Sequence, residues 1–132
     1  MLPLKPSEAT TAGIRVIVQP RYVAARSNAA QGVYFFAYEV EISNVGSTAA
    51  QLLSRHWIIT DGNGEEHHVR GPGVVGEQPH LKPGDTHQYE SFCPLATPEG
   101  AMRGTFQMVS DDGSRFDAEV ATFAFSAPRV LN

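Results

Sequence analysis

Along residues 33–43, every second side chain is large and apolar. This stripe consists of Tyr34, Phe36, Tyr38, Val40 and Ile42. Because successive side chains of a β-strand point to opposite faces, the pattern predicts a strand with one buried face. A register slip of one residue would carry the whole stripe to the solvent side, so the pairing of this strand is strongly specified.

Shorter segments with a similar alternation recur along the chain, and turn residues separate them. They lie at residues 14–18, 51–60, 65–69, 88–95, 102–109 and 116–125. Glycine, asparagine, aspartate or proline mark tight turns at residues 61–64, 82–85 and 111–114. About seven strands without intervening helices predict an all-β sandwich of two antiparallel sheets, with a small closed barrel as the main alternative.

Two local details refine this prediction. Trp57 lies on the third predicted strand and suits a core position between two sheets. The apolar phase changes between Val120 and Phe123, which predicts a β-bulge near Ala121.

The composition is typical of one globular domain, with 132 residues of which 42% are hydrophobic. The net charge of −4 and the scattered basic residues argue against binding to a nucleic-acid backbone. We expect the sandwich to span residues 13–126. Residues 1–12 are predicted to be a flexible N-terminal segment, and residues 127–132 a C-terminal tail.

Cysteine usage and the N-terminal sequence favour a cytoplasmic location. A single cysteine, Cys93, excludes an intrachain disulfide. The chain has no apolar stretch near the ~20 residues that span a bilayer, so membrane insertion is not expected. The first residues also lack the features of a signal peptide. Exposed edge strands would allow a weak homodimer, although Pro20 and the scattered charges fit a monomer equally well.

The segment 70–77 contains glycines in a G-x-G-x-x-G spacing. A dinucleotide site with this spacing needs a strand before it and a helix after it, but prolines and a further predicted strand follow here. One interpretation is an anion site for phosphate, pyrophosphate or a nucleotide, formed by loop amides and basic side chains. Its residues would be Arg55, His56, Arg70, Gly71, Gly73 and Gly76. The other interpretation is a tight turn that needs positive φ angles.

No pattern in the chain indicates a catalytic or metal centre. The histidines lack a recognised ligand spacing, and the neighbours His67 and His68 would point to opposite faces of a strand. Cys93 fits the role of a small buried apolar residue. The chain also lacks a serine-hydrolase motif and a Walker-type lysine. We therefore predict no catalytic residue, no metal and no cofactor.

Phe35 must lie opposite the apolar stripe, on the same side of its strand as Val33. An exposed aromatic ring there would extend an apolar patch of the kind that marks a protein partner site. Cover by residues 22–31 or by the N-terminal segment is the alternative.

Several longer motifs resemble the bacterial ApaG family. They occupy residues 52–61, 69–79, 93–100, 102–108 and 116–117, in one order across residues 13–126. The resemblance implies an immunoglobulin or fibronectin type III-like sandwich. Bacterial members are associated with magnesium and cobalt efflux, and related domains in F-box proteins and a polymerase delta-interacting protein look like interaction modules.

We therefore expect a non-enzymatic binding protein whose partner is another protein, in a process linked to divalent-cation efflux. The alternative is a phosphate or nucleotide-binding protein that uses the segment 70–77. A phosphoanhydride hydrolase is disfavoured because the chain has no evident carboxylate cluster for magnesium.

Overall fold

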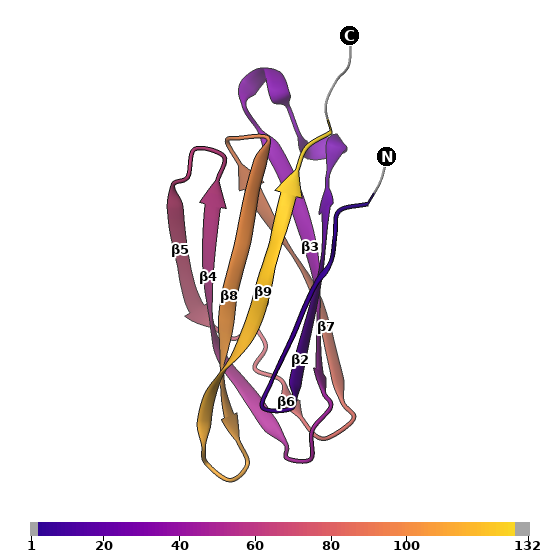
Figure 1. Ribbon diagram of the computed structural model, residues 1–132, viewed down its shortest axis with the longest axis vertical. Coiled ribbons are helices and arrows are strands. Elements are labelled where there is room, and N and C mark those ends of the chain that lie inside the picture. Colours follow the sequence, from indigo (N-terminus) through magenta and orange to yellow (C-terminus); the bar gives the residue numbers. More distant parts are fainter. Residues whose placement is uncertain (1–2, 129–132) are drawn as a thin grey trace.

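The structure is a computed structural model that describes residues 3–128, and these residues form nine β-strands and two single-turn 3-10 helices (Figure 1). The strands are β1 (Ser7–Thr11), β2 (Ile14–Tyr22), β3 (Tyr34–Asn44), β4 (Ala50–Asp61), β5 (Glu66–Pro72), β6 (His80–Leu81), β7 (Thr86–Leu95), β8 (Glu99–Ser110) and β9 (Arg115–Ser126). The helical turns η1 (Ala24–Arg26) and η2 (Ala29–Gln31) lie between β2 and β3. None of the described residues belongs to a helix long and apolar enough to cross a membrane.

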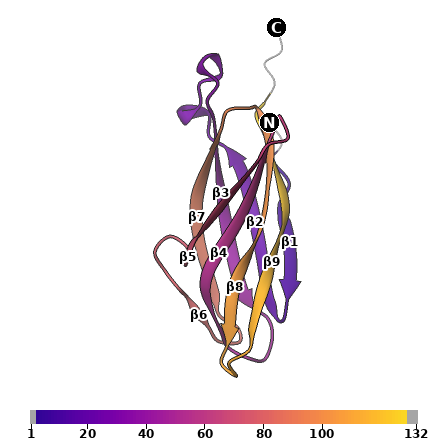
Figure 2. The ribbon, with the colours of Figure 1, turned by 90° about the vertical axis from the view of Figure 1, so that its left-hand side faces the viewer.

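The strands form two antiparallel sheets that pack face to face (Figure 2). One sheet has the order β1-β2-β3-β7, and the other has the order β5-β4-β8-β9 with the short β6 also paired to β4. The prediction of an all-β, two-sheet sandwich is confirmed. β1 and β6 were not among the predicted strands.

The prediction of a flexible segment at residues 1–12 was wrong for Ser7–Thr11, which form β1. This strand pairs with β2 in the register Ser7↔Val18 to Thr11↔Ile14. Ala12 and Gly13 both have positive φ angles, 48° and 81°, and close a tight hairpin between the two strands. The proline and threonine content suggested a flexible segment, but pairing along β2 satisfies the backbone of these residues. Of the predicted tail, residues 129–132 lie outside the described part of the chain.

The core lies between the sheets and contains the predicted stripe of β3. Phe36, Tyr38, Val40 and Ile42 are buried, and Tyr34 packs against the core from its margin. Trp57 is buried as expected, with its ring edge-on to Tyr38 at a centroid distance of 5.5 Å. Burial of such rings contributes roughly 1.5–3 kcal/mol each, which makes the stripe the main determinant of the β3 register.

Two bulges set the direction of side chains on β4 and β9. On β9, Ala121 and Thr122 together oppose one residue of β8, which confirms the predicted bulge near Ala121. On β4, the pairing shifts between Leu52 and Ser54, so that Leu52 and Trp57 both face the core although their numbers differ in parity. Beyond the bulge the alternation is regular, and Arg55 lies on the inner side, the same side as Trp57.

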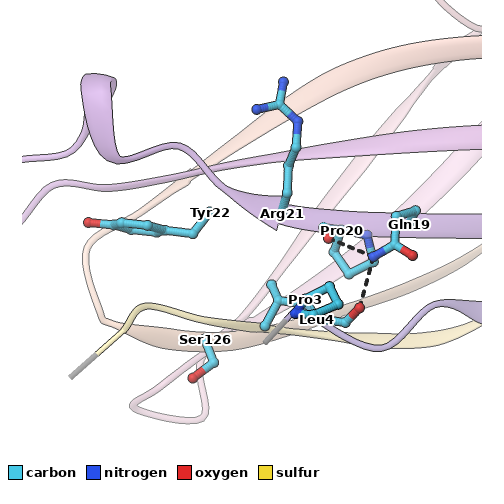
Figure 3. A pocket seen from close by; sticks show the side chains of 7 residues that line it. All are labelled: Pro3, Leu4, Gln19, Pro20, Arg21, Tyr22 and Ser126. Atoms are coloured by element: carbon cyan, nitrogen blue, oxygen red, sulfur yellow. Dashed lines mark hydrogen bonds between the residues drawn. The ribbon is translucent and has the colours of Figure 1, made fainter. Parts of the chain in front are cut away.

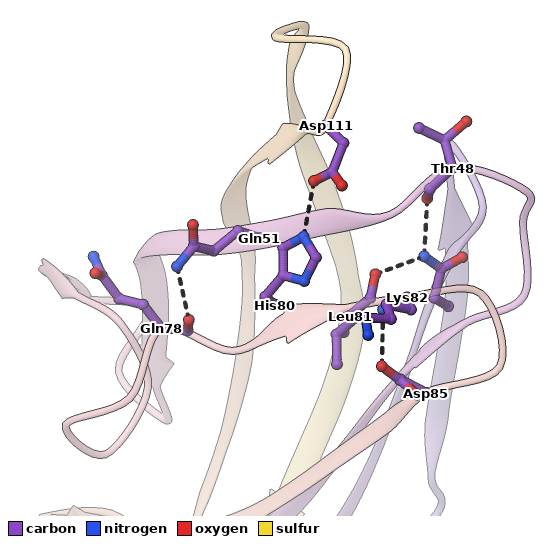
Figure 4. Close-up of polar contacts among 9 residues, drawn as sticks. Thr48, Gln51, Gln78, His80, Leu81, Lys82, Asp85 and Asp111 are labelled. Atoms are coloured by element: carbon purple, nitrogen blue, oxygen red, sulfur yellow. Dashed lines mark hydrogen bonds and ion pairs between the residues drawn. The ribbon is translucent and has the colours of Figure 1, made fainter.

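A segment between β5 and β7 is fixed at one end of the sandwich by polar contacts (Figure 4). The side-chain amide of Asn44 donates to Leu81 O at 3.0 Å and to Thr48 O at 2.9 Å. His80 Nε2 lies 2.8 Å from Asp111 Oδ1, which ties β6 to the turn between β8 and β9. These bonds tie β6 to the end of β3 and to the β8–β9 turn, and they anchor the chain beyond the glycine segment.

The two lateral edges of the sandwich differ. On one side β9 packs against β1 and β2, and the amide of Glu119 donates to Thr11 Oγ1 at 3.0 Å. On the other side, between β5 and β7, side chains from both sheets line hollows that extend inward.

Candidate functional site

The glycine segment consists of a strand end followed by a tight turn, and β6 follows it instead of a helix. β5 continues through Gly71 to Pro72, further than the sequence predicted, because Gly71 pairs with Arg55 of β4. Val74 and Glu77 exchange backbone hydrogen bonds of 2.8 and 3.0 Å. Between them Val75 and Gly76 have φ angles of 47° and 78°, the left-handed pair that closes a two-residue turn.

Steric contacts explain the glycine at position 73. Its φ angle is 59°, and a Cβ atom there would collide with the carbonyl oxygen of Glu77. The Gly73 amide donates to Leu53 O at 2.8 Å, and the next residue, Val74, is only 1% exposed. The turn therefore inserts Val74 into the core. The amides of Gly73, Val74 and Glu77 donate to backbone carbonyls within the fold. The backbone conformation of the turn is therefore enough to explain the glycine spacing. Anion binding by the remaining loop amides stays a prediction.

Arg55 fixes this turn from the inner side of the sheet. Its Nη1 donates to Pro72 O and Gly73 O, both at 3.0 Å. The guanidinium lies against Gly71, where a Cβ atom would come within 2.9 Å of Arg55 Nη2. A Cβ atom at position 71 would therefore require the Arg55 guanidinium to shift. This contact was not visible from sequence.

The sheet separates His56 and Arg70 from Arg55. His56 is paired with Arg70 across β4 and β5, and both project to the outer face. His56 Nε2 lies 2.9 Å from His68 Nδ1. Partial desolvation, followed by the positive charge of Arg70, lowers the pKa of His56 below 6.5. The six residues of the predicted anion site therefore do not converge on one point.

The neighbours His67 and His68 project to opposite faces of β5, as the alternation predicted. His67 lies on the opposite side from His68, with its Nε2 3.5 Å from Asp61 Oδ2. Asp61, Glu65 and His67 together place one possible ligand atom each within 4.8 Å of one another. Asp61 Oδ1 already accepts the amides of Asn63 and Glu65, at 2.9 and 3.1 Å, as part of the hairpin turn. The Asp61 carboxylate therefore stabilises the hairpin turn.

Cys93 is 3% exposed, in agreement with its predicted core role. Burial raises the pKa of its thiol to about 11. The thiol is therefore protonated at neutral pH, whereas a nucleophilic cysteine needs an accessible thiolate.

Phe35 belongs to an aromatic group on the outer face of the first sheet. Its ring centroid lies 5.5 Å from that of Phe92 on β7, which is 47% exposed. The Arg26 guanidinium lies over both rings, 4.2 Å from the centroid of Phe35 and 5.6 Å from that of Phe92. Val33, 37% exposed, lies two residues before Phe35 in the chain. We call Arg26, Val33, Phe35 and Phe92 the aromatic patch.

The segment between β2 and β3 covers this patch only in part. Ser27 Oγ accepts the Phe35 amide at 2.9 Å, which holds the segment beside Phe35 and leaves the ring half-buried. Sequence reasoning did not include Phe92 or Arg26. The alternation of β7 already placed Phe92 on the polar side of its strand. Only the β3–β7 register showed that Phe92 lies opposite Ala37 and therefore near Phe35.

A separate apolar groove of about 310 Å³ lies where the N-terminal segment runs along β2 (Figure 3). Pro3, Leu4, Pro20 and Tyr22 supply most of its apolar lining. Gln19 Nε2 donates to Leu4 O at 2.8 Å and holds the N-terminal segment in place. Arg21 also lines the groove, and its guanidinium is paired with Glu90 at 3.2 Å.

The sequence profile of the ApaG domain matches residues 24–110. Protein ApaG of Chromobacterium violaceum is 53% identical over 119 residues, which cover 90% of this chain and 94% of that protein. Protein ApaG of Anaeromyxobacter dehalogenans is 52% identical over 126 residues, which cover 96% of this chain and 99% of that protein.

Solved structures agree with these matches. The crystal structure of a protein described as ApaA from Bordetella pertussis has a TM-score of 0.86 at 49% identity, covering 97% of this chain and 100% of that chain. The C-terminal domain of wzt has a TM-score of 0.55 at 10% identity, covering 99% and 84%, and shows the shared sandwich fold alone. From the profile match and from relatives about half identical over nearly their whole length, this chain belongs to the ApaG family.

Proposed function

We propose that this protein acts by binding another protein through the aromatic patch, without catalysing a reaction. The observation that carries the proposal is the exposure of Phe92 beside Phe35 on the outer face of a sheet. Large aromatic rings on an otherwise polar sheet face are the residues that most often anchor protein interfaces.

The charges around the patch define the chemistry of the partner. Arg21 is paired with Glu90 at 3.2 Å, whereas no carboxylate in residues 3–128 lies within 4.0 Å of Arg26. The Arg26 guanidinium is held by the two rings and presents its charge at the rim. A matching protein surface has an apolar side chain to cover Phe92 and an acidic side chain beside it for Arg26.

The biological setting of the proposal rests on the family. Bacterial ApaG proteins are associated with magnesium and cobalt efflux, so we place the interaction in the cytoplasm, in a process linked to divalent-cation efflux. The high pKa and burial of the Cys93 thiol support a role without covalent catalysis.

The test compares Phe92→Glu with Val45→Glu, because Val45 is also exposed (54%) but lies beyond the other end of β3. Tagged protein is used to capture partners from a lysate of the parent bacterium, and the affinity of each purified partner is then measured. We expect Phe92→Glu to weaken binding about 30-fold or more, the range of an interface hot spot, and Val45→Glu to leave it unchanged.

A cellular assay follows the same pair of variants. In a strain that lacks the gene, growth under cobalt stress should be restored by the wild-type protein and by Val45→Glu, but not by Phe92→Glu. Full restoration by Phe92→Glu, at equal protein level, would refute the proposal.

A further inference from the structure

A cleft enters the sandwich between β5 and β7, where the two sheets are not closed against each other. It consists of two hollows of about 280 and 290 Å³ that share Tyr38, Arg55, Trp57 and Ser91 in their walls. One hollow passes under Val74 and Val75 of the glycine turn and reaches Tyr89. The other is mainly apolar and is lined further by Ile59, Val69, Phe92, Cys93, Pro94 and Met102.

The charge inside the cleft is uncompensated. Arg55 donates from Nη1 to two backbone carbonyls, but no carboxylate in residues 3–128 lies within 4.0 Å of its guanidinium. A half-buried guanidinium is most stable beside an anion, because hydrogen bonds to carbonyls satisfy its protons without neutralising its charge.

Tyr89 supplies a second, unused donor. Its hydroxyl is buried and has no hydrogen-bond partner among the described residues. Burial raises the pKa of Tyr89 far above its ordinary value, so the hydroxyl keeps its proton and is available to donate. Buried hydroxyl groups without a partner are uncommon in folded proteins, and a bound oxygen acceptor is one way to satisfy them.

From this arrangement we propose that the cleft binds a small organic oxyanion, a carboxylate or a phosphate attached to a compact apolar group. The oxyanion lies between the Arg55 guanidinium and the Tyr89 hydroxyl, and the apolar group enters the hollow beside Trp57 and Met102. Concave sites with a few polar groups on an apolar wall are the usual form of small-ligand sites.

This site differs from both functions that the sequence suggested. The anion is held on the inner side of the sheet, away from His56 and Arg70, and it does not use the glycine amides as its main donors. Neither Arg55 nor Tyr89 belongs to the aromatic patch, although Phe92 lies both in that patch and at the margin of the apolar hollow.

The experiment is an NMR titration of ¹⁵N-labelled protein with benzoate, phenyl phosphate and inorganic phosphate in separate series. We expect saturable shifts of the Val74, Val75 and Ser91 amides and of the Arg55 side-chain N–H. At least one of the two aromatic anions should bind more tightly than inorganic phosphate, and the better of the two identifies the preferred head group.

The decisive variant is Tyr89→Phe, because it removes a hydroxyl that makes no bond in the fold. We expect its thermal stability to equal or exceed that of the wild type and its affinity for the better aromatic anion to fall about tenfold or more. Tyr22→Phe, at the separate groove by the N-terminal segment, should bind like the wild type.

Three results would each overturn the proposal. One is the absence of saturable shifts in the cleft with all three anions at millimolar concentration. Another is unchanged affinity in Tyr89→Phe. The third is binding of inorganic phosphate as tight as that of phenyl phosphate and benzoate, which would remove the role of the apolar hollow.

Discussion

Replacement of Gly73 by alanine tests whether the glycine at this position is required for steric reasons. The new Cβ would collide with Glu77 O, and the backbone there is left-handed. Gly76 provides a matched control, because its φ angle is also positive (78°) but a Cβ atom there would have no neighbour within 4 Å. Both variants share the backbone strain, and only Gly73→Ala adds the collision.

The expected costs follow from these contacts. Holding alanine in a left-handed conformation costs about 1–2 kcal/mol in either variant. In Gly73→Ala the turn must also shift to relieve the collision, which withdraws Val74 from the core. Loss of a buried valine adds roughly 1.5–3 kcal/mol. We therefore expect Gly73→Ala to lower the free energy of unfolding by about 2.5–5 kcal/mol and Gly76→Ala by only about 1–2 kcal/mol.

Urea and thermal unfolding measure both values. The difference between the variants corresponds to a Tm gap of roughly 5–10 °C for a domain of this size. The steric reasoning would be refuted if Gly73→Ala were no less stable than Gly76→Ala. That result would leave the glycine at position 73 without a structural explanation and would favour a binding role for the loop.

Two further predictions concern titration. An NMR titration should give His56 a pKa below 6.5, and Arg70→Ala should raise that pKa by removing a nearby positive charge; a His56 pKa at or above 6.5 would contradict the structure. Since the folded pKa is the lower one, the contribution of His56 to stability is fully present above the unfolded value and is lost as the pH falls through the folded value. The thiol of Cys93, whose pKa is raised to about 11, should react with iodoacetamide at neutral pH only as fast as the protein unfolds; rapid alkylation of folded protein would show that the thiol is accessible.

The parts of the fold that follow from local pattern were predictable. Three such features are the β3 stripe, the core position of Trp57 and the bulge near Ala121. Each depends on which face of one strand a side chain takes, and the alternation of neighbouring residues in the sequence shows this directly. The turn at residues 61–64 was predictable for the same reason, because glycine and asparagine report the backbone angles that a tight turn requires.

Features that depend on pairing between distant segments were not predictable. β1 exists because β2 offers it a partner, and its own sequence resembles a flexible segment. The bulge after Leu52 lets Leu52 and Trp57 both face the core, whereas strict alternation along β4 would place them on opposite faces. The contact of Phe35 with Phe92 likewise required the register between β3 and β7.

The sequence by itself determined a two-layer β architecture and membership of a known family, because alternation and turn chemistry are local and long motifs are specific. Only the tertiary structure decided which residues meet. It placed the residues of the predicted anion site on two sides of a sheet and brought Phe92 beside Phe35. It also placed Arg55 in the same cleft as Tyr89. Such contacts join residues far apart in the chain. They depend on strand register and bulges, which a local sequence pattern does not determine.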